Sequence, residues 1–139
     1  MYMNLIIHLP EWRQLYMFRL GLIGIFLKLI YGKNILLFIN CAKIEGGLFL
    51  QHSYSTYINA NEIGSGTQIW QNVTIGVKQS GGERPTIGRN VKIYTGACVL
   101  GGIKIGNNSV VGANAVVLTD VPDNYLAVGV PARLIPLER

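Results

Sequence analysis

Residues 87–122, IGRNVKIYTGACVLGGIKIGNNSVVGANAVVLTDVP, carry an aliphatic residue at every sixth position. The same frame continues upstream across a polar insertion, so that nine positions conform: Ile63, Ile69, Ile75, Ile87, Ile93, Val99, Ile105, Val111 and Val117. A helix with 3.6 residues per turn cannot keep a six-residue period on one face. A solenoid in which each six-residue unit makes one short strand and one corner fits this period directly.

A second position in each unit supports the solenoid. Four residues after most of the aliphatic positions comes a small or β-branched residue that suits a narrow interior: Thr67, Val73, Val91, Ala97, Ile103, Ser109, Ala115 and Val121. Each inward Ile, Leu or Val then contributes roughly 1.5–3 kcal/mol of stability. Asparagine, which tolerates φ > 0, stands where corners are expected, at positions 72, 90, 107, 108 and 114.

The frame is less regular near its start. Ile44 and Leu50 share a different frame, and Ile58 stands five residues before Ile63, so we expect irregular units between Leu50 and Ile63. Residues 77–86, VKQSGGERPT, are polar and rich in glycine, and the frame is preserved across them. We therefore expect them to form a loop that projects from a corner of the solenoid.

The chain of 139 residues is predicted to hold one solenoid domain over 39–135 and a short tail over 136–139. Apolar residues at three-four spacing predict a helical cap over 1–38, which would cover the open end of the coils. Peripheral contact of these helices with a membrane surface is the alternative. The apolar run over 20–31 is too short to cross a bilayer, and no signal peptide pattern precedes it.

Composition narrows the classes of partner. The formal net charge is +5, but the charges are scattered and no nucleic-acid-binding motif is present, so nucleic acid is not an expected partner. A nucleotide phosphate or an anionic membrane surface accounts better for this mild excess. Cys41 and Cys98 give neither metal-ligand spacing nor a disulfide framework, which favours the cytoplasm, with possible attachment to the inner membrane face.

His52 is the strongest candidate for chemistry. It lies in GGLFLQHSYSTYI, where the frame slips and a side chain can leave the inward columns. Imidazole titrates close to neutral pH and is a common general base. The alternative is a corner histidine that hydrogen-bonds a neighbouring coil. No G-x-S-x-G motif supports a covalent serine mechanism, and a metal site would need histidines from several chains.

The six-residue units, GGLFLQH, the loop ending in GERPTIG and the closing string VGANAVVLTDVPDNYLAVGVPARLI together resemble the hexapeptide-repeat acyltransferases. The similarity covers roughly 39–135 and is greatest to the serine acetyltransferase branch, including short homologues associated with surface-polysaccharide gene clusters. It implies an all-β solenoid, a left-handed parallel β-helix with three units to a coil. It also implies a homotrimer with active sites in the clefts between chains, and acetyl-CoA as acyl donor without a metal.

The resemblance also implies roles for individual residues. His52 falls on the catalytic base, and Glu83 and Arg84 fall in the loop that binds the acceptor. Arg133 is expected to meet a phosphate of acetyl-CoA by charge. The resemblance places the remaining acetyl-CoA contacts at Tyr94, Gly112, Leu118 and Thr119. The contacts of Tyr94, Gly112 and Leu118 are expected to be made mostly by the backbone.

Three departures from the serine acetyltransferases bear on the acceptor. Residues 36–42 contain no acid that could orient His52, which leaves Glu45 or a residue of the neighbouring chain. The histidine that follows the loop arginine in the family is absent after Arg84, and the N-terminal segment is much shorter than in full-size members.

These departures favour an acetyl-CoA-dependent O-acetyltransferase that acts directly on a hydroxyl of a sugar or surface-polysaccharide precursor. Serine O-acetylation in cysteine biosynthesis is the alternative, because Arg84 can bind a carboxylate. A non-catalytic trimeric scaffold and a metal-dependent hydratase on the same solenoid are further alternatives.

Overall fold

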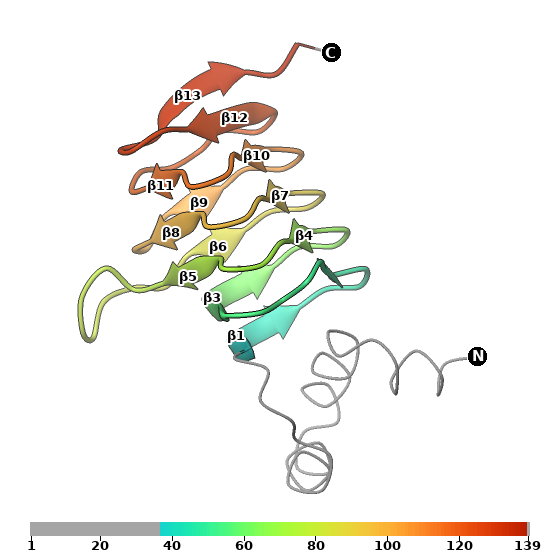
Figure 1. Ribbon diagram of the computed structural model, residues 1–139, viewed down its shortest axis with the longest axis vertical. Coiled ribbons are helices and arrows are strands. Elements are labelled where there is room, and N and C mark those ends of the chain that lie inside the picture. Colours follow the sequence, from blue (N-terminus) through green and yellow to red (C-terminus); the bar gives the residue numbers. More distant parts are fainter. Residues whose placement is uncertain (1–36, 139) are drawn as a thin grey trace, which may run out of the picture.

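The computed structural model describes residues 37–138, which form a solenoid of short strands stacked along one axis (Figure 1). The expected all-β solenoid is confirmed, and its winding is left-handed. The predicted helical cap over 1–38 lies outside the described residues except for Leu37 and Phe38, which belong to β1 and therefore to the solenoid. The strands are β1 (Leu37–Ile44), β2 (Phe49–Leu50), β3 (Thr56–Ile63), β4 (Gln68–Ile69), β5 (Thr74–Gly76), β6 (Thr86–Ile87), β7 (Lys92–Ile93), β8 (Cys98–Leu100), β9 (Lys104–Ile105), β10 (Val110–Val111), β11 (Val116–Val117), β12 (Tyr125–Val128) and β13 (Arg133–Pro136).

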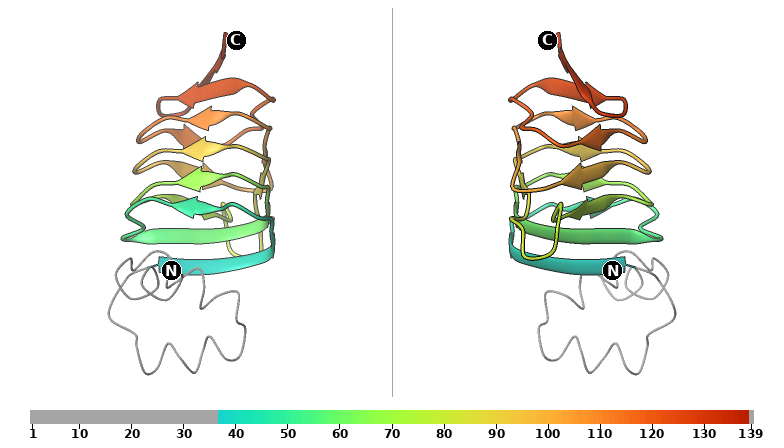
Figure 2. Two further views of the ribbon diagram at one scale, coloured as in Figure 1. Left: turned by 90° about the vertical axis from the view of Figure 1, so that its right-hand side faces the viewer. Right: turned by 90° about the vertical axis from the view of Figure 1, so that its left-hand side faces the viewer.

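Strand pairing divides the coils into three faces, each built on a ladder of parallel strands. Figure 2 shows the stacked coils from two sides. Face 1 contains β2, β4, β7, β10 and β12. Face 2 contains the first halves of β1 and β3, followed by β5, β8 and β11. Face 3 contains the second halves of β1 and β3, followed by β6 and β9. The long strands β1 and β3 therefore bend around the corner between faces 2 and 3.

The hydrophobic core is the set of columns that the repeat predicts. All nine residues of the six-residue frame are at most 1% exposed, and strand pairing stacks them on one another, as in the column Ile69, Ile93 and Val111. The second position of each unit is buried as well, except that Ile103 is half-buried and packs against the core from its edge. The inward assignment of the repeat is therefore correct.

The register explains where the frame slips. Ile93 pairs with Val111 eighteen positions later, which is three six-residue units. In the first coil, eight positions separate Leu50 from Ile58 and five separate Ile58 from Ile63, where regular units have six. The expected irregularity between Leu50 and Ile63 is thus a two-residue insertion at one corner and a one-residue deletion at the next.

Three corners run the length of the solenoid, and each is named here for its main feature. The histidine corner joins face 1 to face 2 and contains residues 51–55, 70–73, 94–97 and 112–115. The loop corner joins face 2 to face 3 and contains residues 59–61, 77–85, 101–103 and 118–120. The asparagine corner joins face 3 to face 1 and contains residues 45–48, 64–67, 88–91, 106–109 and 122–124.

Corner geometry accounts for the asparagine and glycine positions. Asn72, Asn90, Asn108 and Asn114 adopt positive φ as expected for corners, whereas Asn107 instead bonds neighbouring coils through its side chain. At the asparagine corner the coils approach so closely that a Cβ on Gly64 would lie 2.6 Å from the carbonyl carbon of Gly88. Glycine after the aliphatic residue is therefore required there by the stacking of the coils.

The C-terminal end departs from the parallel pattern. After β12 the chain turns back, and β13 pairs antiparallel with β12 so that Val128 lies opposite Arg133. The strand β13 is exposed along its length. It forms the end of face 1 at the last coil. A further repeat would add a parallel strand there, whereas β13 is antiparallel.

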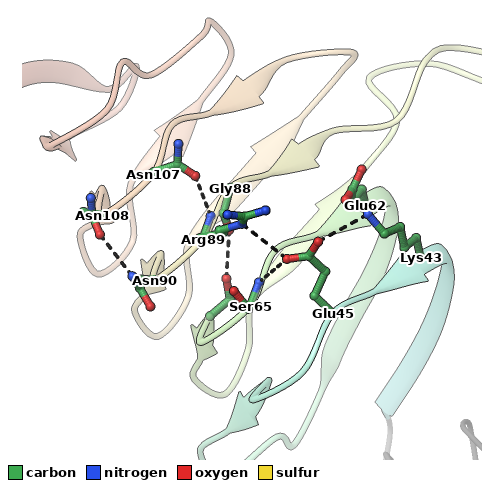
Figure 3. A network of polar contacts seen from close by, with 10 residues as sticks. Lys43, Glu45, Glu62, Ser65, Gly88, Arg89, Asn90, Asn107 and Asn108 are labelled. Atoms are coloured by element: carbon green, nitrogen blue, oxygen red, sulfur yellow. Dashed lines mark hydrogen bonds and ion pairs between the residues drawn. The ribbon is translucent and has the colours of Figure 1, made fainter.

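A network of polar contacts joins successive coils along the asparagine corner (Figure 3). The Glu45 carboxylate accepts a hydrogen bond from the Ser65 backbone N–H and pairs with Lys43 and Arg89. The Ser65 N–H and the Lys43 ammonium hold the pKa of Glu45 below its usual value. Further along, the Asp123 carboxylate accepts bonds from both the side chain and the backbone N–H of Asn107, at 3.1 and 2.7 Å.

Asp123 gives a pH-dependent prediction. The Asn107 side chain and backbone lower the pKa of Asp123 in the folded chain below the value of about 3.9 in the unfolded chain. The stability that this carboxylate contributes is therefore present above pH 4 and is lost as the pH falls through the lower folded pKa. We expect Asp123→Asn to lower the melting temperature at pH 7, with a difference that shrinks on acidification. Thermal melts of both chains from pH 7 to pH 3 measure it, and a constant difference would contradict the assignment.

Candidate active site

His52 stands on the two-residue insertion of the first coil, at the histidine corner. Its side chain is exposed and its backbone has φ of 49°, an unusual conformation for a residue other than glycine or asparagine. The turn is closed by the Tyr54 N–H, which donates to the His52 carbonyl at 2.5 Å. Ser53, only 1% exposed, anchors the insertion in the coil. The insertion thus directs the imidazole outward, as the frame slip predicts.

Gln51 contacts the imidazole directly. Its amide nitrogen lies 3.0 Å from His52 Nε2, within hydrogen-bonding distance. An amide nitrogen can only donate, so this contact uses the Nε2 lone pair in the tautomer whose ring proton stands on Nδ1. An acceptor hydroxyl that replaced the Gln51 amide there would meet a competent base.

Glu45 is not the residue that orients His52 within this chain. Its carboxylate is directed into the network of the asparagine corner, at the opposite end of face 1 from the histidine corner (Figure 3). Sequence reasoning missed Gln51, although it immediately precedes His52 in GGLFLQH. The Gln51 amide contacts the ring without itself adding a charge that would stabilise an imidazolium.

Aromatic side chains extend the histidine corner toward the later coils. Backbone hydrogen bonds between coils place Gln51, Trp70, Tyr94 and Gly112 one above another. The rings of Trp70 and Tyr94 are tilted by 40° with centroids 4.5 Å apart. The N–H groups of Tyr94 and Gly112 already donate to Val111 and Ala127 of the next coils, so a ligand can reach these two residues only through carbonyls or side chains.

Arg133 reaches the same corner from the C-terminal end. It pairs across β13 and β12 with Val128, which follows Gly112 in the column of the histidine corner. Its side chain is exposed, as a phosphate-binding arginine must be. Gly112 lies beneath it, where an added Cβ would come within 2.7 Å of Val128 Cγ1, so the glycine there is required by packing.

Glu83 and Arg84 lie at the loop corner, near the end of the projecting loop (Figure 1). The structure begins β6 at Thr86, so the loop spans 77–85 and is one residue shorter than expected. Asn61 of the preceding coil fixes this segment, since its side chain donates to the Arg84 carbonyl at 2.9 Å and its N–H donates to the Pro85 carbonyl at 2.8 Å.

The positive charge of Arg84 acts on the Cys41 thiol in the first coil. Burial raises the pKa of the Cys41 thiol on β1, and the positive charge of Arg84 acts in the opposite direction. Leu118, half-buried, and Thr119, exposed, follow β11 at the same corner, four coils from Cys41.

The eight predicted site residues divide equally between two corners of the prism. The histidine corner holds His52, Tyr94, Gly112 and, at its end, Arg133, and the loop corner holds Glu83, Arg84, Leu118 and Thr119. Face 2 separates the two groups. One chain by itself therefore does not bring Arg84 and His52 into one cleft.

Two buried polar atoms lie beside His52 on its corner. Of the side chains in residues 37–138, only Ser53 Oγ and Gln71 Oε1 are buried without a hydrogen-bond partner. Such an atom costs roughly 1–3 kcal/mol when it stays unpaired. Both belong to the histidine corner, which therefore has unused hydrogen-bonding capacity beneath the insertion.

Comparison with known proteins agrees with this geometry. Residues 84–119 match the family of bacterial transferase hexapeptide repeats (six repeats). The solenoid is a hexapeptide-repeat transferase domain. It is 43% identical over 97 residues to serine acetyltransferase of Synechococcus elongatus, which covers 68% of this chain and 40% of that protein.

Solved structures of serine acetyltransferases share this hexapeptide-repeat domain. The Neisseria gonorrhoeae enzyme in complex with serine is 36% identical, with a TM-score of 0.60 over 70% of this chain and 42% of that one. The Brucella abortus enzyme in complex with coenzyme A is 35% identical, with a TM-score of 0.63 over 73% of this chain and 43% of that one. The chain spans 35% to 59% of the lengths of four curated relatives that it matches.

These comparisons support the expected kind of enzyme, an acetyl-CoA-dependent O-acetyltransferase, but do not support the expected sugar acceptor. The similar proteins carry the name serine acetyltransferase, and none of those described here supports a sugar or polysaccharide acceptor. Within residues 37–138 of the hexapeptide-repeat domain, no three His, Cys, Asp or Glu side chains come together as metal ligands. The same part of the chain has no helix whose length and apolar character would let it cross a bilayer.

Proposed function

We propose that the chain is an acetyl-CoA-dependent O-acetyltransferase whose acceptor is the hydroxyl of L-serine. The observation that carries this proposal is the outward imidazole of His52, held on a corner insertion with Gln51 beside its Nε2. The similarity to serine acetyltransferases supports serine as acceptor. Arg84, with five fixed N–H donors, suits the serine carboxylate.

The transfer would proceed without a covalent enzyme intermediate. His52 Nε2 takes the proton of the serine hydroxyl as its oxygen bonds to the thioester carbonyl carbon. The C–S bond then breaks, the acetyl group stays on serine, and the imidazolium returns the proton to the sulfur of CoA. The Gln51 amide can rotate to present its oxygen to the imidazolium, because an amide carries both a donor and an acceptor.

The division of the site supports a ring of three chains. If the histidine corner of one chain lies against the loop corner of the next, Arg84 approaches the neighbour's His52 and face 2 turns toward the three-fold axis. The described outward residues of face 2 carry no charge: Phe38, Asn40, Tyr57, Asn59, Thr74, Cys98, Leu100, Val116 and Leu118. Face 3 is different, since Lys43, Glu62 and Lys104 point outward from it.

Exposed aromatic rings mark the same face. Phe38 and Tyr57 are 46% and 42% exposed in the single chain, and their rings stack with centroids 4.5 Å apart at 6°. Paired exposed aromatics of this size are typical of surfaces that become buried on assembly. Face 2 therefore fits the inner surface of the proposed homotrimer, with acetyl-CoA lying between the two corners.

Thiol release from acetyl-CoA tests the proposed function. The full chain is incubated with acetyl-CoA and, separately, with L-serine, L-threonine and a panel of hexoses and N-acetylhexosamines. We expect release of free CoA with L-serine and formation of O-acetylserine by mass spectrometry. Turnover with a sugar and not with serine would replace the acceptor, and no turnover with any acceptor would favour a non-catalytic scaffold.

A further inference from the structure

The loop that carries Arg84 rests on two glycines of the next coil. Gly101 and Gly102 follow β8 at the loop corner, directly after the position that pairs with Gly76 at the start of the loop. A Cβ added to Gly101 would lie 3.7 Å from Lys78 Cβ, near the start of the loop. A Cβ added to Gly102 would lie 2.6 Å from Glu83 Cβ and 3.3 Å from its carboxyl carbon.

The two glycines are needed for different reasons. Gly101 has φ of 99°, a conformation that residues with a side chain rarely adopt, so glycine is required there by the backbone. The φ of Gly102 lies outside that region, so its backbone could accept another residue. The three atoms nearest to a Cβ added at Gly102 all belong to Glu83, so the contact with Glu83 is the tightest obstacle to a side chain there.

That contact cannot be relieved by a rotamer change alone. The Glu83 carboxylate is the flexible end of its side chain and can swing away from a new methyl group. Its Cβ is fixed to the backbone, and 2.6 Å is far shorter than the contact distance of two carbons, about 3.5–4.0 Å. A methyl group at Gly102 must therefore displace the backbone of the loop at Glu83.

The displacement would reach Arg84 directly, because it is the next residue. The Glu83–Pro85 segment is held on one side by Asn61 of the preceding coil and on the other side by Gly102 of the following coil. Arg84 is thus positioned between two coils. Its guanidinium depends on both supports for its place at the loop corner.

We propose that Gly102 is a positioning residue for acceptor binding, whose missing side chain seats Glu83 and thereby sets the place of Arg84. The inference rests on the proposed function, in which Arg84 binds the serine carboxylate. A loop displaced by a methyl group would weaken binding of the acceptor and leave the His52 chemistry at the other corner unchanged.

Kinetics of Gly102→Ala in the full chain test the proposal. We expect KM for serine to rise at least 10-fold, with kcat and KM for acetyl-CoA within about 3-fold of the original, because misplacement of a binding group by about 1 Å is costly. Gly46→Ala is the matched control, since Gly46 is also a corner glycine and an added Cβ there has no atom within 4 Å. An unchanged KM for serine in Gly102→Ala would overturn the proposal.

A double variant distinguishes displacement of Glu83 from general damage to the fold. Glu83→Gly removes the Cβ that the new methyl group would strike, so adding Gly102→Ala to this background should change KM for serine less than about 3-fold. If Gly102→Ala raises KM equally in both backgrounds, Glu83 does not transmit its effect and the proposal is wrong.

Trypsin cleavage after Lys78 gives a readout independent of the reaction. We expect faster cleavage in Gly102→Ala than in the original chain or in Gly46→Ala, because the loop loses its seat. If the original chain acetylates serine but Gly102→Ala changes neither KM for serine nor the cleavage rate, this inference is overturned and the proposed function is not. Absence of serine turnover by the original chain overturns the proposed function, while equal cleavage rates would still show that Gly102 does not seat the loop.

Discussion

Ile105→Asp is expected to abolish cooperative folding of the C-terminal coils. Ile105 is completely buried, pairs with Ile87 in the preceding coil and bridges to Val121 in the next. A carboxylate there would have no partner, and burying it costs several kcal/mol even if it takes up a proton. Whole domains are stable by only about 5–15 kcal/mol. Hydrogen exchange should show lost protection from β8 to β12, with the first coils affected less because coils contact only their neighbours.

The control for this variant is Lys92→Asp, which introduces the same carboxylate on an outward strand position. Lys92 is exposed and pairs with Gln68 and Val110, neither of which is charged. We expect its melting temperature to stay close to that of the original chain. A soluble Ile105→Asp chain with the same cooperative melt as Lys92→Asp would contradict the inward column.

Substitution of His52 is expected to have the largest effect on turnover. Removing a general base commonly lowers the rate by about 10²–10⁴-fold, so His52→Ala should lose at least 10²-fold in kcat with serine. His52→Asn is the better-matched variant, because asparagine tolerates the positive φ at this position and has no group that titrates near neutral pH.

The stability and the assembly of both His52 variants are measured beside their turnover. We expect the melting temperature and the mass of the assembly by light scattering to stay as in the original chain, because His52 is exposed and outside the core. A His52→Asn chain with full turnover would dismiss His52 as the base. Lost turnover together with a lost assembly would show that the residue acts on structure instead.

The repeat predicts the fold almost completely, because one local rule is applied again in every coil. The residues of the six-residue frame are all inward, and the slip before Ile63 proved to be an insertion and a deletion at successive corners. The antiparallel return of β13 was not predictable from the period, since it begins where the period ends. The left-handed winding came from resemblance, because chain physics favours the opposite hand in crossover connections.

The site was less predictable than the fold. His52 stands out because it interrupts the frame, but contacts between coils join residues that are far apart in sequence. Glu45 was a reasonable partner for His52 by sequence distance, yet the solenoid places it at another corner and sets Gln51 beside the ring. The seat of Glu83 on Gly102 depends likewise on the stacking of two coils.

Complementation between two impaired variants, assayed at serine concentrations well below KM of the Arg84 variant, tests most directly the claim that His52 of one chain works with Arg84 of the next. His52→Asn and Arg84→Ala chains, with different affinity tags, are expressed together, and assemblies that carry both tags are purified. Each trimer that carries both tags contains one chain of one kind and two of the other, so one of its three sites combines an unmodified His52 with an unmodified Arg84, and about a third of the original sites should be restored. We predict serine acetylation close to that fraction, far above either variant alone, whereas mixed assemblies no more active than their parents would contradict the account.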